Sequence, residues 1–243
     1  MKNALSQLLI CILLGFLCDQ CLADDEETSL LASLRRAHPS TPFESVAKTP
    51  IHGIYEIVIG KRLYYSDTSG RYFLSGSLVD MQTHQDLSAS KRELLARIDV
   101  AKLPLADAFT HVRGVGSRKV YLFSDPDCPY CRTLQSELEK VDDLAVVVFE
   151  YPLTSLHPEA ESKAISIWCA TDDAARWNLW HEALIENRIV AKSNCSNPIA
   201  RNVALGENLK IRGTPTLISS DGRVMSGMAT VASINQWLAK TSK

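Results

Sequence analysis

Two cysteines separated by two residues stand between a strand pattern and a helix pattern, and this junction limits the folds open to the chain. Residues 120–124 form a short β-rich run, and Leu134 and Leu138 begin an apolar stripe at helical spacing. Cys128 and Cys131 lie between them. Cys128 is therefore expected at a helix N-terminus, where free backbone N–H groups and the helix dipole favour a thiolate over a thiol.

This placement gives the two cysteines different expected roles. Cys128 is expected to be the exposed nucleophile, and Cys131, one turn into the helix, to be shielded and to attack a mixed disulfide. Pro129 fits the first helical turn, where its missing N–H is not needed. No metal is expected, because Cys169 and Cys195 do not form a second closely spaced ligand pair. A purely structural role is disfavoured, because so short a disulfide loop is typically strained.

The first 23 residues have the layout of a secretory signal peptide. An apolar run of about ten residues is too short for the roughly 20 that span a bilayer. Cleavage is expected after Ala23, with an uncleaved anchor as the alternative. Four of the seven cysteines then remain in a compartment that permits disulfides. We expect an exported protein with no stable membrane insertion after cleavage.

Composition excludes several classes of function. Apolar residues make up 46% of the 243 residues and charged residues 22%, which argues for a folded chain. The net charge is −2, and the basic residues form no long run. Nucleic acid and anionic membranes are therefore not expected partners.

Residues 24–87 predict a small N-terminal domain of antiparallel β structure. Apolar and aromatic runs separated by turns predict strands at 54–59, 62–65 and 72–74. A unit of this size buries little apolar surface alone, so it is expected to pack on a second copy or another domain. Residues 88–112 follow as a predicted linker helix region, in which apolar spacing predicts a helix over 88–100.

Residues 113–243 predict a second, larger domain. Beyond the cysteine pair, the patterns predict a strand buried on both faces at 145–149, helices at 159–170 and 174–186, strands at 216–218 and 224–226, and a final helix. Asp221 and Gly222 supply the hairpin turn between the last two strands. This order of elements predicts a mixed sheet with helices on both faces.

Taken together, these motifs resemble the thioredoxin superfamily, and more closely the exported disulfide isomerases of the DsbC and DsbG group. The resemblance rests on residues 123–131 around the cysteine pair and on Gly213-Thr214-Pro215 about 85 residues later. It extends to residues 164–170 and to residues 50–57, which resemble the dimerisation domain of that group. Nearly the whole mature chain is covered.

The resemblance implies an α/β chain, α+β overall. A small cystatin-like antiparallel β dimerisation domain and a linker helix would precede a C-terminal thioredoxin-like fold with inserted helices. It also implies a V-shaped homodimer, with Cys128 as the attacking thiolate and Cys131 as the resolving thiol. Thr214 and a cis Pro215 would abut the cysteine pair and bind substrate backbone. No cofactor is implied.

Two features of the resemblance leave the subfamily open. Cys169 and Cys195 match the position of a second, structural disulfide in DsbC. Pro129 and Tyr130 between the active cysteines are the pair associated with DsbG. The redox potential of this chain's cysteine pair can therefore not be taken from either DsbC or DsbG.

The expected function is that of a periplasmic protein disulfide isomerase or reductase that rearranges incorrect disulfides through the Cys-Pro-Tyr-Cys dithiol. The implied partners are misfolded or misoxidised exported proteins and a DsbD-like membrane reductant. Alternatives are a sulfenic-acid reductase of DsbG type, a holdase chaperone with incidental cysteines, and a helper dedicated to one secretion or conjugation apparatus. Net oxidase activity is disfavoured, because a dimeric architecture would shield the site from a membrane oxidant.

A few further residues have simpler expected roles. His157 and His181 show no partner pattern that supports catalysis, so surface or helix packing is expected for both. The acidic run at 24–27 is expected to be a solvated terminus. Glu150 ends the buried strand. An alternative role for its side chain is that of a buried proton acceptor for Cys131, as an acidic group is in some thioredoxin-fold proteins.

Overall fold

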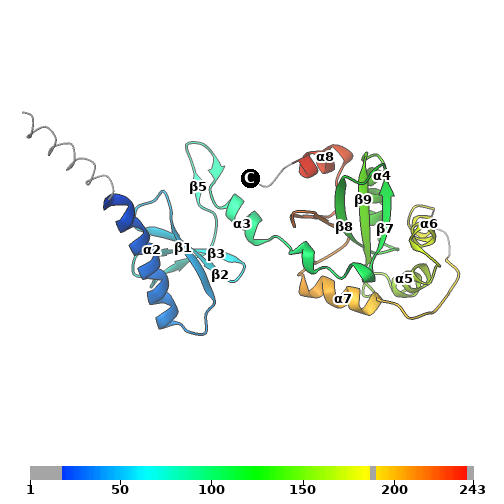
Figure 1. Cartoon of the computed structure of the whole chain (residues 1–243), viewed down its shortest axis with the longest axis horizontal. Helices are drawn as coiled ribbons and strands as arrows, with labels where there is room; N and C mark the ends of the chain where they lie inside the picture. Colours follow the sequence, from blue (N-terminus) through cyan, green and yellow to red (C-terminus); the bar gives the residue numbers. More distant parts are fainter. Residues whose placement is uncertain (1–17, 187–189, 240–243) are drawn as a thin grey trace, which may run out of the picture. The chain divides into compact units, whose positions relative to one another are not determined.

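The computed structural model describes residues 18–186 and 190–239 and divides the chain into two units, residues 1–96 and residues 97–243 (Figure 1). Residues 1–17 of the predicted signal peptide lie outside the described residues. Within the described ranges, no helix combines the length and apolar composition needed to cross a membrane. Each unit is described by itself below.

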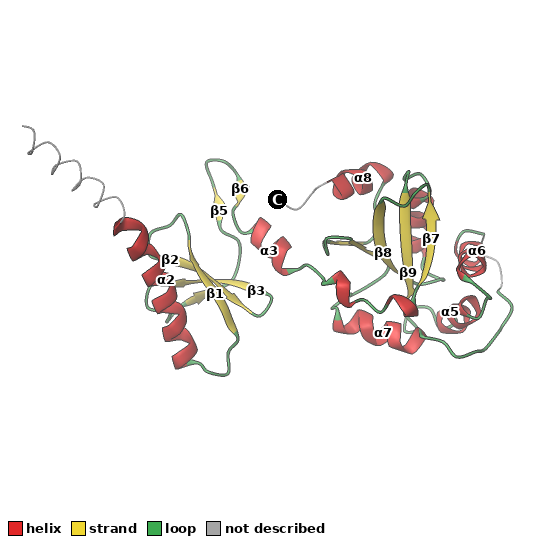
Figure 2. Ribbon diagram, viewed as in Figure 1, coloured by secondary structure: helices red, strands yellow, loops and turns green. Residues whose placement is uncertain are grey.

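The first unit packs a helix on an antiparallel sheet (Figure 2). The elements are α2 (Cys18–Ala37), β1 (Phe43–Lys48), β2 (Ile54–Ile59), β3 (Arg62–Asp67) and β4 (Phe73–Leu74), with the strands side by side in that order. Alternation along β2 buries Tyr55 and Ile57 in one apolar cluster with Leu30 and Leu34 of α2. The three predicted strands are confirmed, while α2 is an element that the sequence patterns did not reveal.

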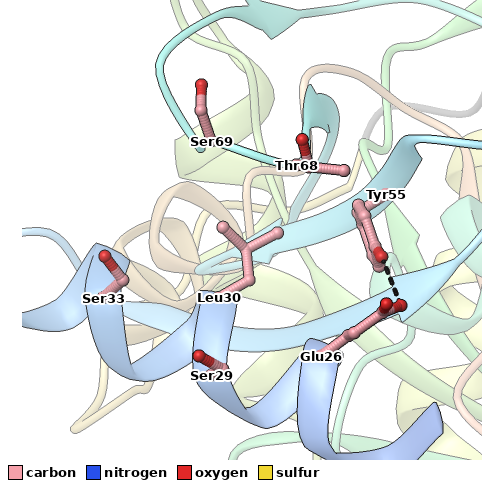
Figure 3. A pocket seen from close by; sticks show the side chains of 7 residues that line it. All are labelled: Glu26, Ser29, Leu30, Ser33, Tyr55, Thr68 and Ser69. Carbon is pink, nitrogen blue, oxygen red and sulfur yellow. Dashed lines mark hydrogen bonds between the residues drawn. The ribbon is translucent and has the colours of Figure 1, made fainter. Parts of the chain in front are cut away.

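Residues 24–27 belong to α2, so they are not a chain terminus in the structure, but Glu26 remains solvated as expected, with 62% of its side chain exposed. Glu26 and Glu27 also bond to the sheet, which the sequence did not predict. Glu26 accepts a hydrogen bond from the Tyr55 hydroxyl at 3.0 Å (Figure 3). It also forms an ion pair with Lys48 at 3.0 Å. Glu27 accepts a hydrogen bond from the Lys48 backbone N–H at 2.9 Å. The helix continues past the predicted cleavage position after Ala23.

The first unit ends in a short hairpin and a short helix. These are β5 (Val79–Asp80), β6 (Gln85–Asp86) and α3 (Ala89–Leu95). The helix predicted over 88–100 thus stops five residues early. The reason is a backbone hydrogen bond in the second unit, from Ile98 N–H to the Gly222 carbonyl at 2.9 Å, which is incompatible with a continued helix.

The second unit is built on a five-stranded mixed sheet. Its strands are β7 (Phe109–Arg113), β8 (Arg118–Ser124), β9 (Leu144–Glu150), β10 (Thr216–Ser219) and β11 (Val224–Ser226), in the spatial order β11-β10-β8-β9-β7. The pair β8 and β9 is parallel, and the other pairs are antiparallel. The sequence placed residues 109–112 in the linker region, but β7 pairs with β9 and so belongs to this sheet.

Helices cover the sheet of the second unit. They are α4 (Pro129–Leu138), α5 (Ala160–Trp168), α6 (Asp173–Leu184), α7 (Ile199–Asn208) and α8 (Val231–Ala239). Four of them follow the sequence patterns, whereas α7 was not predicted as a helix. In α7, Gly206 lies against the Tyr151 ring so closely that a Cβ there would come within 2.6 Å of it.

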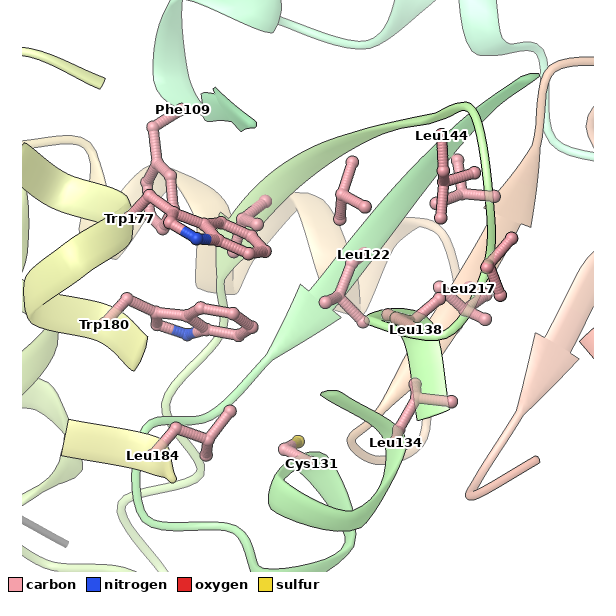
Figure 4. Close-up of a cluster of buried hydrophobic side chains, with 14 of the residues drawn as sticks. Phe109, Leu122, Cys131, Leu134, Leu138, Leu144, Trp177, Trp180, Leu184 and Leu217 are labelled. Atoms are coloured by element: carbon pink, nitrogen blue, oxygen red, sulfur yellow. The ribbon is translucent and has the colours of Figure 1, made fainter. Parts of the chain in front are cut away.

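Side chains that alternate along β8 and β9 supply two cores. Leu122 and Val148 face a cluster that includes Cys131, Trp177 and Trp180 (Figure 4). The intervening residues of the two strands lie on the opposite face of the sheet. There they pack in a second apolar cluster with residues of α7 and of the segment before β7. Every residue of β9 is buried, which confirms the prediction of a strand covered on both faces.

The turn between β10 and β11 allows a test of the contact with Ile98 that accompanies the early end of α3. Gly222 has φ +84°, and a Cβ there would lie 2.2 Å from the Ile98 carbonyl oxygen. Gly227 is a matched control, since it also has φ +84° but would meet nothing within 4 Å. We expect Gly227→Ala to cost about 1 kcal/mol of unfolding free energy from backbone strain.

Gly222→Ala adds a collision with backbone to the same strain, so it is expected to cost roughly 1–3 kcal/mol more. Urea denaturation of both variants measures the difference. Equal losses in the two variants would mean that residue 98 does not pack on this turn.

Candidate active site

Cys128 lies at the junction of β8 and α4. The strand ends at Ser124, and Pro129 is the first residue of the helix, so Cys128 is the N-cap residue, with extended backbone angles. Its backbone N–H donates to the Asp125 carbonyl at 3.1 Å. The prediction of a cysteine at a helix N-terminus is confirmed.

The expectation that Cys128 is exposed is wrong. Its residue surface is 5% exposed, against 2% for Cys131, and Tyr130 between them is 66% exposed. The cover comes from a segment far away in the sequence, because the Thr214 carbonyl oxygen lies 3.5 Å from the Cys128 sulfur, which donates to it only when protonated. A partner sulfur must therefore reach Cys128 beside the segment that carries Thr214.

The environment separates the acidities of the two thiols. Hydrogen bonds, first from the Cys131 side chain and then from Thr214 and the backbone N–H groups of Cys131 and Tyr130, lower the pKa of Cys128 to about 5. Burial raises the pKa of Cys131 well above its ordinary value, and the neighbouring Cys128 adds to this effect. Cys131 lies at the edge of the apolar cluster with Leu134 and Leu184 (Figure 4). At neutral pH the pair is one thiolate beside one thiol.

The segment before β10 reaches the cysteines through the sheet. Thr216 of β10 pairs with Phe123 of β8, one residue before the end of that strand. The Thr214–Pro215 peptide bond is cis, and the Pro215 carbonyl accepts a hydrogen bond from Gly227 N–H at 2.8 Å. The structure therefore brings Thr214 beside Cys128 across 86 residues of chain.

A buried carboxylate organises the loop that carries Cys128. One oxygen of Asp125 accepts the backbone N–H of Asp127 at 2.8 Å. The other oxygen accepts the N–H of Leu153 at 2.7 Å and contacts Nδ1 of His157 at 2.9 Å. The sequence predicts surface or helix packing for His157, and no spacing rule links it to Asp125, 32 residues earlier.

Glu150 ends β9 as a buried acid. Within the described residues, neither of its carboxylate oxygens has a hydrogen-bond partner, and burial raises its pKa well above the ordinary value. Its register partner in β8 is Ser124. A role as proton acceptor for Cys131 remains a prediction.

The other two cysteines of the second unit are bonded to each other. Cys169, directly after α5, and Cys195 form a disulfide with their Cα atoms 5.8 Å apart. Cys128 and Cys131 are free thiols. The reactive pair and the bonded pair are therefore separate features of the same unit.

A hollow in the first unit offers hydroxyl groups but no thiol among its described lining residues. It lies between α2 and the sheet and is lined by hydroxyl groups, Leu30 and the Glu26–Tyr55 pair (Figure 3). None of the residues that line it is a cysteine. The chemistry available to the described residues is therefore concentrated at the junction of β8 and α4.

The acidities predict a pH profile for alkylation by iodoacetamide. Because the pKa of Cys128 is lowered to about 5, its reaction rate is expected to rise as the pH increases through 5 and to level off by pH 7. Cys131 is expected to stay unreactive over this range. Peptide mapping after timed quenching measures both rates.

The variant Cys131→Ala removes the largest cause of the low pKa, so the midpoint for Cys128 is expected to move to higher pH. A midpoint near 8.5 in the unaltered protein, as for a free cysteine, would contradict this description of the site.

Comparison with known proteins agrees with both units. The family model for a disulfide bond isomerase protein N-terminal domain matches residues 21–89, and the model for a thioredoxin-like domain matches residues 105–242. A crystal structure of a disulfide interchange protein from Neisseria gonorrhoeae superposes with a TM-score of 0.53. It is 39% identical and covers 56% of this chain and 96% of that chain.

Curated relatives extend over most of the chain. The probable thiol:disulfide interchange protein DsbC of Bordetella avium is 33% identical over 195 residues, which are 80% of this chain and 68% of the relative. Its counterpart in Bordetella pertussis is 35% identical over 75% of this chain and 63% of the relative. DsbC of Escherichia coli is 22% identical over 82% of both chains. The chain belongs to the DsbC family of thiol:disulfide interchange proteins.

Proposed function

We propose that this protein is a disulfide isomerase and reductase of exported proteins, with Cys128 as the attacking group. The observation that carries the proposal is the contrast between the two thiols of one helical turn. Cys128 is a thiolate at neutral pH, and Cys131 is a buried thiol. A thiolate is the form of cysteine that attacks a disulfide.

The first step forms a mixed disulfide. The Cys128 thiolate attacks one sulfur of a client disulfide, a bond forms between Cys128 and that sulfur, and the client's other sulfur leaves as a thiolate. The low pKa of Cys128 also makes it a good leaving group. A second client thiolate can therefore displace it, which rearranges the client's disulfides with no net change in oxidation.

The same intermediate can be resolved by reduction. Cys131 loses its proton and attacks Cys128, so that the client leaves with two thiols and the enzyme keeps a Cys128–Cys131 disulfide. An external dithiol must then supply two electrons before the next cycle. We propose a membrane reductant of the DsbD type for this step, because isomerisation requires the reduced pair.

Thr214 and Pro215 are proposed to bind the client's backbone. Their segment covers Cys128, and the Thr214 carbonyl oxygen lies 3.5 Å from the Cys128 sulfur. A client that approaches Cys128 must pass along this segment, whose backbone groups can pair with an extended chain. The Cys169–Cys195 disulfide is proposed to brace the fold without taking part in exchange.

The first unit is proposed to form a homodimer. Residues 21–89 match the N-terminal domain model of the family. The edge strand β4 and its neighbour Tyr72 expose apolar and aromatic side chains, and such an edge is prone to pair with another chain. Export to the periplasm is proposed from the signal layout of the first 23 residues.

The proposed activity is tested with a scrambled multi-disulfide protein such as inactive ribonuclease. Reduced protein is expected to restore the substrate's activity, and Cys128→Ser is expected to abolish this because the attacking sulfur is gone. Cys169→Ser with Cys195→Ser is the matched control, and it is expected to keep the activity at a temperature where it stays folded. Recovered ribonuclease activity over time is the readout.

Three other results would overturn the proposal. Suppressed aggregation without recovered activity, unchanged in Cys128→Ser, would indicate a holdase. Reduction of a protein sulfenic acid without rearrangement of disulfides would indicate a reductase of single oxidised cysteines. Recovery that survives Cys128→Ser would exclude Cys128 as the attacking group.

A further inference from the structure

His157 lies on the loop after β9 and faces the loop that carries Cys128. Its Nδ1 atom is 2.9 Å from a carboxylate oxygen of Asp125, which is fully buried. The backbone carbonyl of the same Asp125 accepts the N–H of Cys128 at 3.1 Å. The buried residue Asp125 therefore contacts both the imidazole of His157 and the backbone of the reactive Cys128.

Two carboxylates stand close to Cys128 in the sequence, and each has a basic partner from a distant segment. Asp125 contacts His157, and Asp127 forms an ion pair with Lys163 of α5. Negative charge on these carboxylates would disfavour a thiolate at Cys128. Burial, and to a lesser extent the charge of Asp125, raise the pKa of Glu150 well above its ordinary value, which disfavours a further negative charge there.

We propose that protonated His157, held in place by Asp125, is a positioning residue that offsets the carboxylate charge beside Cys128 and thereby keeps Cys128 in the thiolate form. The proposal rests on the proposed role of Cys128 as the attacking thiolate. The proposal adds that thiol–disulfide exchange at Cys128 depends on a residue outside the cysteine motif. His157 acts on Cys128 through charge and does not contact the reacting sulfur in this account.

The electrostatics of His157 agree with this geometry. Its pKa is raised, first by the hydrogen bond with Asp125, against an opposing effect of burial, and then by the charges of Asp125, Cys128 and Asp127. Coupling between two sites is reciprocal, so a thiolate that favours the imidazolium is favoured by it to the same extent. The two groups therefore exchange protons with the solvent as a linked pair.

A second histidine in the same unit provides a matched control. His181 also contacts a carboxylate, with Nε2 2.9 Å from Glu139, and its side chain is 31% exposed against 21% for His157. Glu139 is the C-cap residue of α4, whereas Cys128 is the N-cap residue. The two ends are separated by about 16 Å of helix. His181 thus matches His157 in pairing but is remote from Cys128.

The first test measures the imidazoles by NMR titration of the reduced, full chain. Replacing Cys128 by Ser is expected to reduce the proton affinity of His157 about three- to tenfold, the size expected for two unit charges a few ångström apart that are screened by water. The proton affinity of His181 is expected to stay unchanged. An unchanged His157, or equal changes in the two histidines, would overturn the proposal.

The second test measures the thiolate by its absorbance at 240 nm. His157→Asn keeps a donor near the position of Nδ1 but carries no charge, so it separates charge from positioning. The proton affinity of the Cys128 thiolate is expected to rise about three- to tenfold in this variant, and alkylation at pH 5 to slow accordingly. His157→Arg is expected to restore much of the effect, and His181→Asn to leave it unchanged.

The outcomes separate this inference from the proposed function. If Cys128 in the unaltered protein is not a thiolate at neutral pH, the proposed function itself fails. The second case is that Cys128 is a thiolate and that its proton affinity is unchanged in His157→Asn. If that variant is folded as judged by circular dichroism, only the role of His157 is refuted. A rise in His157→Arg equal to that in His157→Asn would also refute the role of its charge.

Discussion

The carboxylate of Asp125 fixes the geometry on which the reactive site depends. It lies at the end of β8, fully buried, and its two oxygens bind the backbone of its own loop and the backbone of the loop that follows β9. The parallel pairing of β8 and β9 brings these two loops to the same edge of the sheet. Because a buried carboxylate without such donors would be costly, the two loops can hardly move apart without disrupting it. Cys128 therefore starts α4 from a fixed backbone position.

From that position the two thiols acquire different chemistry. Cys128 receives hydrogen bonds from the first turn of α4, from Cys131 and from the Thr214 segment, whereas Cys131 points into the apolar cluster with Leu134. The same fold that buries Cys131 also covers Cys128 with the residues proposed to bind a client. Substrate binding and thiolate exchange are therefore expected to use one continuous surface.

Features that depend on local pattern were predictable from the sequence, and features that depend on distant segments were not. The N-terminal placement of Cys128, the buried strand β9 and the turn at Gly222 each follow from a few neighbouring residues. By contrast, the cover over Cys128 and the contact of His157 with Asp125 arise only when segments 30 to 90 residues apart meet. The strand β7 was not predicted because it is an edge strand in which every residue except Phe109 is at least partly exposed, so its alternating pattern is weak.

The most direct test of the account is to capture the intermediate at the sulfur that forms it. Reduced protein carrying Cys131→Ala, which lacks the resolving thiol, is mixed with an oxidised multi-disulfide protein, and the adducts are mapped by mass spectrometry. The account predicts a stable mixed disulfide at Cys128 and none at Cys169 or Cys195. The reciprocal variant Cys128→Ala is predicted to form no adduct at Cys131, because that thiol is buried and protonated. Equal capture at Cys131 would contradict the assignment of the two roles.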